Sequence, residues 1–362
     1  MYFRIFDCWR FVAAILIMAY HFLFWAPYGS EAGTALLHRL LPLLDMFFMI
    51  SGFFITIRYR ERVGDLASYG RFMRARAARL LPLHYLITLF FVVIALFAWA
   101  RGAQHYDWRH HLEALPFHLA LLHSLGTTDG LALNYPSWSV SAEFFSYALF
   151  PLIVLILRFG GLPSLLAVIA IWIGCLEVAS AQGWFPTGHW TSADATGGYR
   201  ALADFMIGAA AAIIVERRLF SITSHWPGFL ATVLVVAAML SGCHYAIVMP
   251  VMVLALTLTA LAETAAPEST AFLKPLMPLT RVAFGIYLLH PVLEFLFLEV
   301  VWSRWLEPAG TIDFYVFSTL PMIATVALAL FSARYFEPRC AGVLLPAKDG
   351  SSKRGGRLAP VW

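Results

Sequence analysis

Apolar residues along this chain are grouped in long runs, which short polar segments separate. Most of these runs approach 20 residues, the length with which an α-helix crosses a hydrocarbon core of roughly 30 Å. The shorter segment 112–125 also contains histidines, and we expect it to form an interfacial or re-entrant helix in an outer loop. The pattern predicts ten membrane-spanning helices, over residues 9–26, 40–57, 83–100, 138–157, 162–182, 200–215, 229–244, 246–262, 282–301 and 312–333.

The composition agrees with a membrane protein. Apolar residues make up 61% of the 362 positions and charged residues 13%, and the mean hydropathy is +0.76. A soluble domain averages about 25% charged residues. We therefore predict an all-α polytopic integral membrane protein with one membrane domain, residues 1–340, and a polar, disordered cytoplasmic tail, residues 341–362. The net charge of +4 does not indicate a nucleic-acid partner.

The distribution of basic residues predicts the orientation of the helices. If both termini are cytoplasmic, the connections on the inner side hold 20 of the 25 lysines and arginines, and those on the outer side hold 5. Positive residues are retained on the cytoplasmic side of membranes. We therefore expect both termini to be cytoplasmic, and we read the first apolar run as a retained span rather than a cleaved signal peptide.

Several ionisable residues fall inside the predicted spans, where an unpaired charge costs about 2.5–3.5 kcal/mol. Arg10 and His21 lie eleven residues apart in the first span, on one helix face and separated by about 16 Å. Asp45 and Glu143 are expected at a depth similar to that of His21, with His290 nearer the middle of its span. One interpretation is a general base, His21, that Asp45 or Glu143 orients. The alternative is a set of separate buried polar residues, each with its own hydrogen-bond partner.

A basic segment precedes the third predicted span. In "RFMRARAARLLP", Arg76 and Arg79 are three residues apart and therefore neighbours on one helix face, and Arg74 is close by. Arginine binds phosphate groups in a bidentate manner, so the cluster suits a phosphorylated ligand. Its spacing alone favours a simpler role, as an anchor on anionic lipid.

Five sequence blocks, in order along nearly the whole chain, resemble the membrane acyltransferase-3 family, which includes bacterial O-acetyltransferases of surface polysaccharides. The blocks are "RFVAAILIMAYH", "DMFFMISGFFI", "RARAARLLP", "YPSWSVSAEFFSYALFPL" and "FGIYLLHP", and a late "FEPR" resembles a further family element. Two positions depart from the family pattern. Ala75 stands where an arginine is usual, and Phe284 with Gly285 replaces the usual Ser-Tyr pair.

The resemblance implies transfer of an acyl group, usually acetyl, from cytoplasmic acyl-CoA to a sugar hydroxyl. Arg10 and His21 would be the essential pair, with Asp45 and Glu143 as further catalytic candidates. The resemblance places the CoA phosphates on Arg76 and Arg79, with Arg74 beside them. The remaining motif positions include Ser51 and Gly52. The candidates for contact with substrate are Trp138, Ser139, Ser141, Tyr287 and His290.

In the mechanism that we expect, acetyl-CoA is the donor and His21 acts as a general base or as a transient acyl carrier. A pantetheine arm of roughly 15–20 Å matches the rise from Arg10 to His21. The expected partners are acyl-CoA, a carbohydrate acceptor, the bilayer and polysaccharide-assembly proteins, and the expected location is the bacterial inner membrane. We expect no metal, because the spacing of the outer-loop histidines fits no metal site. These histidines are His105, His110, His111, His118 and His123.

Other interpretations remain open. A transporter or flippase could use His21, Asp45 and Glu143 as a proton relay. An inactive subunit of a polysaccharide-assembly complex is a second alternative, and a small secreted acceptor is a third. In the outer loop 183–198, tryptophan, histidine and aspartate residues suit a sugar, although tryptophan is common at membrane interfaces in any case.

Overall fold

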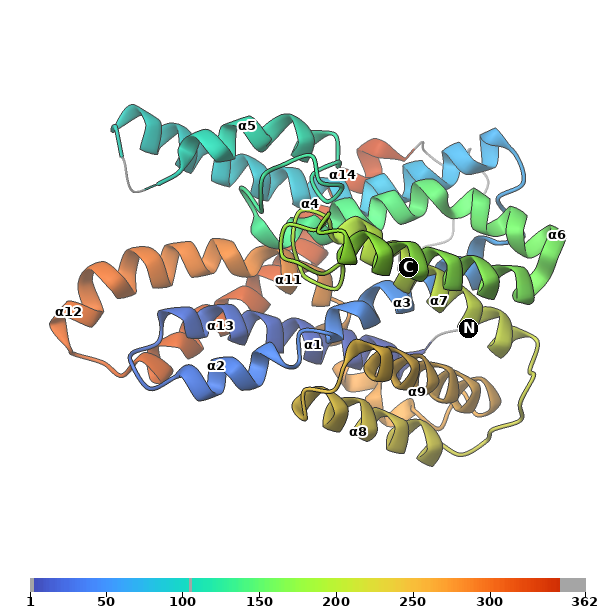
Figure 1. Ribbon diagram of the computed structural model, residues 1–362. Helices are drawn as coiled ribbons and strands as arrows, with labels where there is room; N and C mark the ends of the chain where they lie inside the picture. Colours follow the sequence, from blue (N-terminus) through green and yellow to red (C-terminus); the bar gives the residue numbers. More distant parts are fainter. Residues whose placement is uncertain (1–2, 104–105, 346–362) are drawn as a thin grey trace, which may run out of the picture.

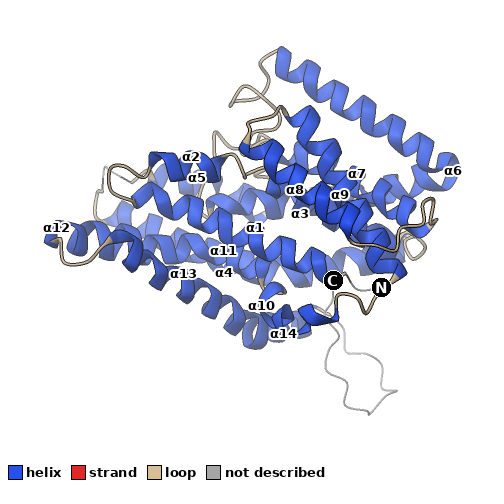
Figure 2. Cartoon of the chain, turned by 90° about the horizontal axis from the view of Figure 1, so that it is seen from below, coloured by secondary structure: helices blue, strands red, loops and turns tan. Residues whose placement is uncertain are grey.

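The computed structural model describes residues 3–103 and 106–345 of the chain, and within these ranges the regular structure is helical throughout, with no strand. The expected tail largely lies outside the described residues. Its first part does not begin at residue 341 as a separate segment, because the last helix continues to Leu344. Figures 1 and 2 show one bundle of long helices, in which α2, α5 and α12 lie at one end and α14 lies toward the other.

The bounds of the α-helices are α1 Arg4–Phe22, α2 Glu31–His38, α3 Leu43–Tyr59, α4 Leu66–Ala100, α5 Trp108–Leu119, α6 Trp138–Ala181, α7 Gly197–Glu216, α8 Trp226–Leu240, α9 Tyr245–Ala265, α10 Met277–Thr280, α11 Ala283–Leu293, α12 Glu307–Ala309, α13 Phe314–Phe331 and α14 Glu337–Leu344. Three short 3₁₀ segments are η1 Leu23–Trp25, η2 Tyr135–Ser137 and η3 Ala271–Leu276. Two segments are π-helical, η4 Glu294–Leu306 and η5 Ser332–Phe336.

Every predicted span falls on a helical segment. Among the described residues, eight continuous helical stretches are long and apolar enough to cross a membrane. The difference from ten has two sources. Helix α8, with 15 residues, is shorter than a usual span, and α6 joins two predicted spans at Gly161, whose φ of 65° and ψ of −160° interrupt the helix. Figure 1 shows α6 folding back on itself at this turn. The chain is thus a multi-pass membrane protein, and the count of ten stays a prediction.

Helix α4 begins much earlier than the predicted span at residue 83. It starts at Leu66, after a reciprocal cap in which the backbone N–H of Ser68 donates to Asp65 Oδ1 at 2.7 Å and the backbone N–H of Asp65 donates to Ser68 Oγ at 3.1 Å. Such a pair satisfies two amides that the first turn leaves without partners. The basic segment therefore belongs to the same 35-residue helix as the apolar span. Its arginines are held in a fixed register with the bundle.

The centre of the bundle is the contact between α3 and α7. A Cβ atom added to Gly52 would lie 2.0 Å from the backbone oxygen of Phe205, and one added to Gly208 would lie 1.9 Å from that of Met49. The two glycines thus allow the helix backbones to touch from both sides, as small residues do in membrane helix pairs. Gly52 is a motif position, and the structure gives it this packing role.

Candidate active site

His21 lies in the last turn of α1 and is only partly buried. Its ring packs against two other polar rings, with centroid distances of 4.7 Å to Tyr135 and 5.3 Å to His290. The two imidazoles are nearly parallel, at 23°. Among the described residues, the ring nitrogens of His21 have no hydrogen-bond partner. Both nitrogens are therefore left for a group that is not part of the chain.

Behind His21 is a chain of hydrogen bonds that sequence reasoning did not find. The Tyr135 hydroxyl donates to Glu294 Oε2 at 2.7 Å, and the Trp25 indole N–H donates to Glu294 Oε1 at 2.9 Å. His290 Nε2 lies 3.1 Å from the Tyr135 oxygen. Because a hydroxyl carries one hydrogen, which goes to Glu294, the imidazole must donate here. His290, a predicted site residue, is thus brought to His21 together with Tyr135, Glu294 and Trp25.

One of these residues could have been found from the sequence. Glu294 lies inside the predicted span 282–301, four residues after His290 and on the same helix face. The rule that an ionisable residue at membrane depth is a functional candidate therefore applied to it. Tyr135 gave no such signal, because an aromatic residue before a span is typical of the membrane interface.

Asp45 does not orient His21. It is buried and accepts two hydrogen bonds from the guanidinium of Arg200 on α7, of which the bond from Nη2 to Oδ2 is 2.8 Å long. Arg200 also donates to the backbone oxygen of Thr191, and Asp204 interacts with the same ion pair. The prediction that Asp45 orients His21 is wrong, because the Arg200 guanidinium binds both oxygens of the Asp45 carboxylate. Asp45 joins α3 to α7.

Glu143 does not contact His21 either. Its Oε1 accepts hydrogen bonds from the Ser51 hydroxyl, at 2.7 Å, and from the Tyr147 hydroxyl. Ser51 lies six residues beyond Asp45 on α3, about 9 Å along the helix axis. The expectation that Glu143 and Asp45 share one depth is therefore wrong.

The arginines of the basic segment meet Arg10 near Glu143. Arg79 interacts electrostatically with Arg10, Arg76 and Glu337, and its guanidinium lies over the Phe284 ring at 5.8 Å. The guanidinium of Arg10 faces the Phe47 ring at 5.4 Å. The structure thus brings together the predicted residues Arg10, Arg76 and Arg79, from α1 and α4.

The three arginines of the basic segment differ in access. Arg76 is 2% exposed, and its Nη2 donates to the Tyr59 hydroxyl at 3.1 Å. Arg79 is partly buried, whereas Arg74 is exposed. A ligand that arrives from the end of the bundle could reach Arg74 and Arg79 directly. It would have to displace Tyr59 to bind Arg76.

The remaining predicted positions separate into two groups. Tyr287 is 6.0 Å from the His290 ring, and the Ser139 hydroxyl donates to the backbone oxygen of Pro136 at 3.0 Å, so both lie beside the His21 cluster. Ser141 and Trp138 are buried and have structural contacts. Ser141 Oγ donates to Leu121 and accepts from Ser124, and Gly197 packs against the Trp138 ring. The expected contact of Ser141 and Trp138 with substrate is not supported.

Two of the outer-loop histidines, His118 and His123, stack on each other. The rings of His118 and His123 are parallel and 3.7 Å apart, with His84 of α4 beside them at 5.7 Å from His123. His123 Nε2 donates to the backbone oxygen of Ser137 at 3.0 Å. No group of three ligating side chains suited to a metal occurs among the described residues. His105 lies outside them.

The outer loop 183–198 is also occupied with its own contacts. Trp190 is buried and donates its indole N–H to Glu177, and Asp194 accepts from the Thr187 hydroxyl at 2.6 Å. Trp184 is exposed. The aromatic and acidic residues suggested for sugar contact thus mainly fix the loop, and only Trp184 presents an open aromatic face.

The helical membrane bundle thus places an imidazole with free nitrogens on α1, the helix that also contributes Arg10 to the arginine cluster, and its fold is that of a multi-pass membrane protein. Comparison with known proteins is more specific. The acyltransferase domain family matches residues 3–331, and the chain belongs to this acyltransferase-3 family. The expected family is confirmed.

A relative is the acyltransferase MdmB of Streptomyces mycarofaciens. It is 32% identical over 154 residues, which cover 40% of this chain and 37% of that protein. The match therefore spans well under half of either chain. No solved structure matches this chain.

Proposed function

We propose that this protein transfers an acetyl group from acetyl-CoA to a hydroxyl group of a cell-envelope or exported carbohydrate, in the inner membrane of a bacterium. The observation that carries the proposal is the position of His21, on the same helix as Arg10 and about 16 Å from it, with both ring nitrogens available. The donor's anionic end is attracted to the arginine cluster, and its thioester extends toward His21.

In the proposed reaction the acceptor oxygen attacks the thioester carbonyl carbon, and His21 takes the hydroxyl proton. The carbon–sulfur bond breaks, and the CoA thiolate leaves and receives that proton from His21. In the two-step variant the His21 nitrogen attacks the carbonyl carbon first, the carbon–sulfur bond breaks, and the CoA thiolate leaves. The alcohol then displaces the acetyl group from the nitrogen, and the alcohol proton goes to the thiolate. Both variants need a neutral imidazole with an open nitrogen.

The residues behind His21 act as positioning residues in this proposal. Glu294 is held by two donors, Tyr135 and Trp25, so its carboxylate is fixed. It in turn fixes the hydroxyl of Tyr135, against which the His21 ring packs. A ring restrained in this way loses less entropy on reaching the reactive geometry.

The test is acetyl transfer by the purified protein in detergent, followed by mass spectrometry of envelope glycans from cells with and without the gene. His21→Ala should abolish transfer at normal yield and melting temperature. His38→Ala is the matched control, because His38 is exposed near the same end of the bundle and has only a distant ring contact with Tyr20. Wild-type transfer by His21→Ala would contradict the mechanism. Solute movement across vesicles without acetylation would favour the transporter instead.

A further inference from the structure

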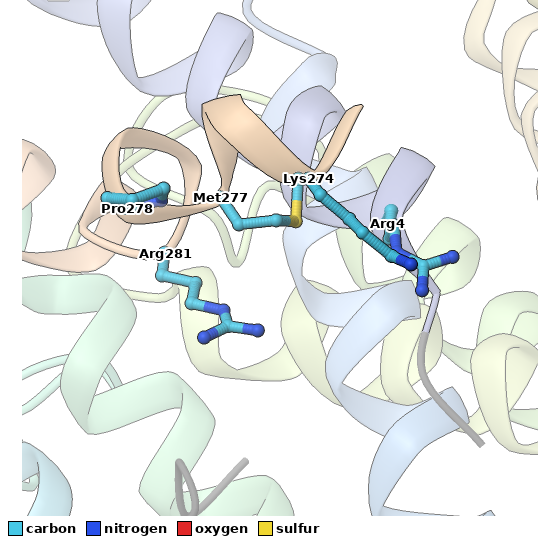
Figure 3. Close-up of a pocket in the computed structure, with 5 residues that line it drawn as sticks. All are labelled: Arg4, Lys274, Met277, Pro278 and Arg281. Carbon is cyan, nitrogen blue, oxygen red and sulfur yellow. The ribbon is translucent and has the colours of Figure 1, made fainter. Parts of the chain in front are cut away.

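A basic cavity opens at the end of the bundle where the chain begins. It is lined by Arg4, Lys274, Met277, Pro278 and Arg281 and has a volume of about 510 Å³ (Figure 3). Arg4 starts α1, Lys274 belongs to η3, and Arg281 follows α10. Three cationic side chains from three segments therefore face one space, and its lining, within the described chain, contains no carboxylate.

Hydrogen bonds fix the position of Arg4 at the cavity. The Arg4 guanidinium is held in place through Nη1, which donates to the backbone oxygen of Pro267 at 2.6 Å and to the Thr270 hydroxyl at 3.0 Å. The buried Glu263 accepts from the backbone N–H of Arg4 at 2.9 Å and from Thr270 at 2.6 Å. Glu263 therefore fixes the start of α1 from outside the lining of the cavity.

Lys274 is more adjustable. It pairs with Glu268 at 2.9 Å, and both side chains are largely exposed, 56% and 75%. Exposed pairs of this kind are worth little in water. Glu268 also lies 3.8 Å from Arg4, so this one carboxylate is shared by two cations. An anion with two negative charges could compete for both.

The position of the cavity relates it to the arginine cluster. Arg4 lies six residues before Arg10, about 9 Å further from His21 along α1. Arg281 lies three residues before Phe284, on whose ring the Arg79 guanidinium rests. Positive charge thus continues from Arg10 and Arg79 to the cavity, in the direction away from His21.

We propose that this cavity binds a phosphate monoester, namely the 3′-phosphate at the nucleotide end of acyl-CoA. This inference rests on the proposed function, because it takes the donor to be acyl-CoA. With the acyl group at His21 and the pantetheine arm passing Arg10, the nucleotide end comes next, on the side of Arg4. Arg76 is buried against Tyr59, and the cavity supplies the accessible cations that Arg76 does not.

The same chemistry could serve the headgroup of an anionic lipid, so the experiment separates the two sources. KM is measured for acetyl-CoA and for acetyl-dephospho-CoA, which lacks only the 3′-phosphate, in wild type, Lys274→Gln and Arg281→Gln. Both variants should raise KM for acetyl-CoA about tenfold, with kcat unchanged and KM for the dephospho donor unchanged. The control Arg62→Gln removes one exposed charge near the inner end of α3 and should alter neither.

The inference is overturned if a variant raises KM equally for both donors, or raises it for neither. Each variant is its own folding control, since the two donors are compared on the same protein. If the cavity binds a lipid headgroup, the melting temperature of wild type should be higher in phosphatidylglycerol nanodiscs than in phosphatidylcholine nanodiscs. The variants should lack this increase, and their KM for acetyl-CoA should equal that of wild type. This result also overturns the inference.

If wild type transfers no acetyl group from either donor, the proposed function fails instead. Calorimetric binding of CoA and dephospho-CoA to the same proteins then decides the inference separately. Tighter binding of CoA by wild type, lost in Lys274→Gln, supports the phosphate site, and equal binding of both compounds overturns it.

Discussion

At the scale of single residues, two acidic centres of the molecule have different tasks. Asp45 and Asp204 lie around the guanidinium of Arg200, deep in the contact between α3 and α7. Glu294 lies beside His21 through Tyr135. A carboxylate that is fully paired to an arginine ties helices together, whereas one that accepts from neutral donors can orient a reacting group.

These two centres predict opposite results for two charge-removing variants. Arg200→Gln leaves buried carboxylates without their cation and should lower the free energy of unfolding by about 3–5 kcal/mol. Glu294→Gln keeps the shape of the side chain and should leave the melting temperature almost unchanged, but lower kcat about tenfold with KM for acetyl-CoA unaltered. Thermal unfolding and acetyl transfer on both variants measure the contrast. A Glu294→Gln variant with wild-type kcat would remove Glu294 from the site.

At the scale of helices, hydropathy predicted where the spans lie and failed where a helix continues beyond its apolar part. The span at 83–100 is the end of α4, whose first turns are basic and therefore invisible to an apolar pattern. The turn at Gly161 follows from a backbone conformation, not from composition, although the predicted boundary between 157 and 162 lies on it. The close contact of α3 with α7 could not be predicted from the sequence, because a glycine in a predicted span does not identify the helix that packs against it.

This contact gives a prediction for a single methyl group. Gly208→Ala places a Cβ against the backbone oxygen of Met49, which cannot move without shifting α3. We expect a fall in melting temperature and loss of the Asp45–Arg200 geometry, with lower yield of folded protein. Gly174→Ala is the matched control, since Gly174 is an exposed glycine of α6 with open space around it, and alanine there should be neutral or slightly stabilising. Equal melting temperatures for both variants would contradict the packing argument.

At the scale of the whole molecule, the site is assembled from segments that no spacing rule connects. Arg10 and His21 could be paired from the sequence because one helix carries both. His290 reaches His21 through the packing of α11 against α1, Tyr135 through the packing of η2 against α11, and Glu294 through the contact of η4 with η1. Sequence reasoning therefore predicts the imidazole of His21 as a site residue but gives it the wrong partners, Asp45 and Glu143.

The stacked histidines of the outer loop make the stability of the whole protein depend on pH. Burial lowers the pKa of His123 to about 4, and burial together with the neighbouring His123, His84, His111 and His110 lowers the pKa of His118 to about 2. In an unfolded chain a histidine titrates near a pKa of about 6.5. At pH values between the folded-state and the unfolded-state pKa, these histidines are protonated in the unfolded chain but neutral in the folded protein. The free energy of unfolding therefore falls as the pH falls below about 6.5.

The size of this effect is up to about 1.4 kcal/mol per pH unit for each histidine. Melting temperatures in detergent between about pH 7 and pH 5 should decrease steadily, and His123→Gln should flatten the slope. His244→Gln alters an exposed histidine and should leave the slope as it is. If the melting temperature of wild type does not change with pH, the histidines of the stack are not held neutral by burial, and the prediction is wrong.

The turn at Gly161 has a consequence for how the protein is made. One glycine with positive φ joins the two arms of α6, and no polar loop lies between them. We therefore expect the two arms to insert into the lipid as one helical hairpin, because a single glycine leaves no polar segment that could keep them apart.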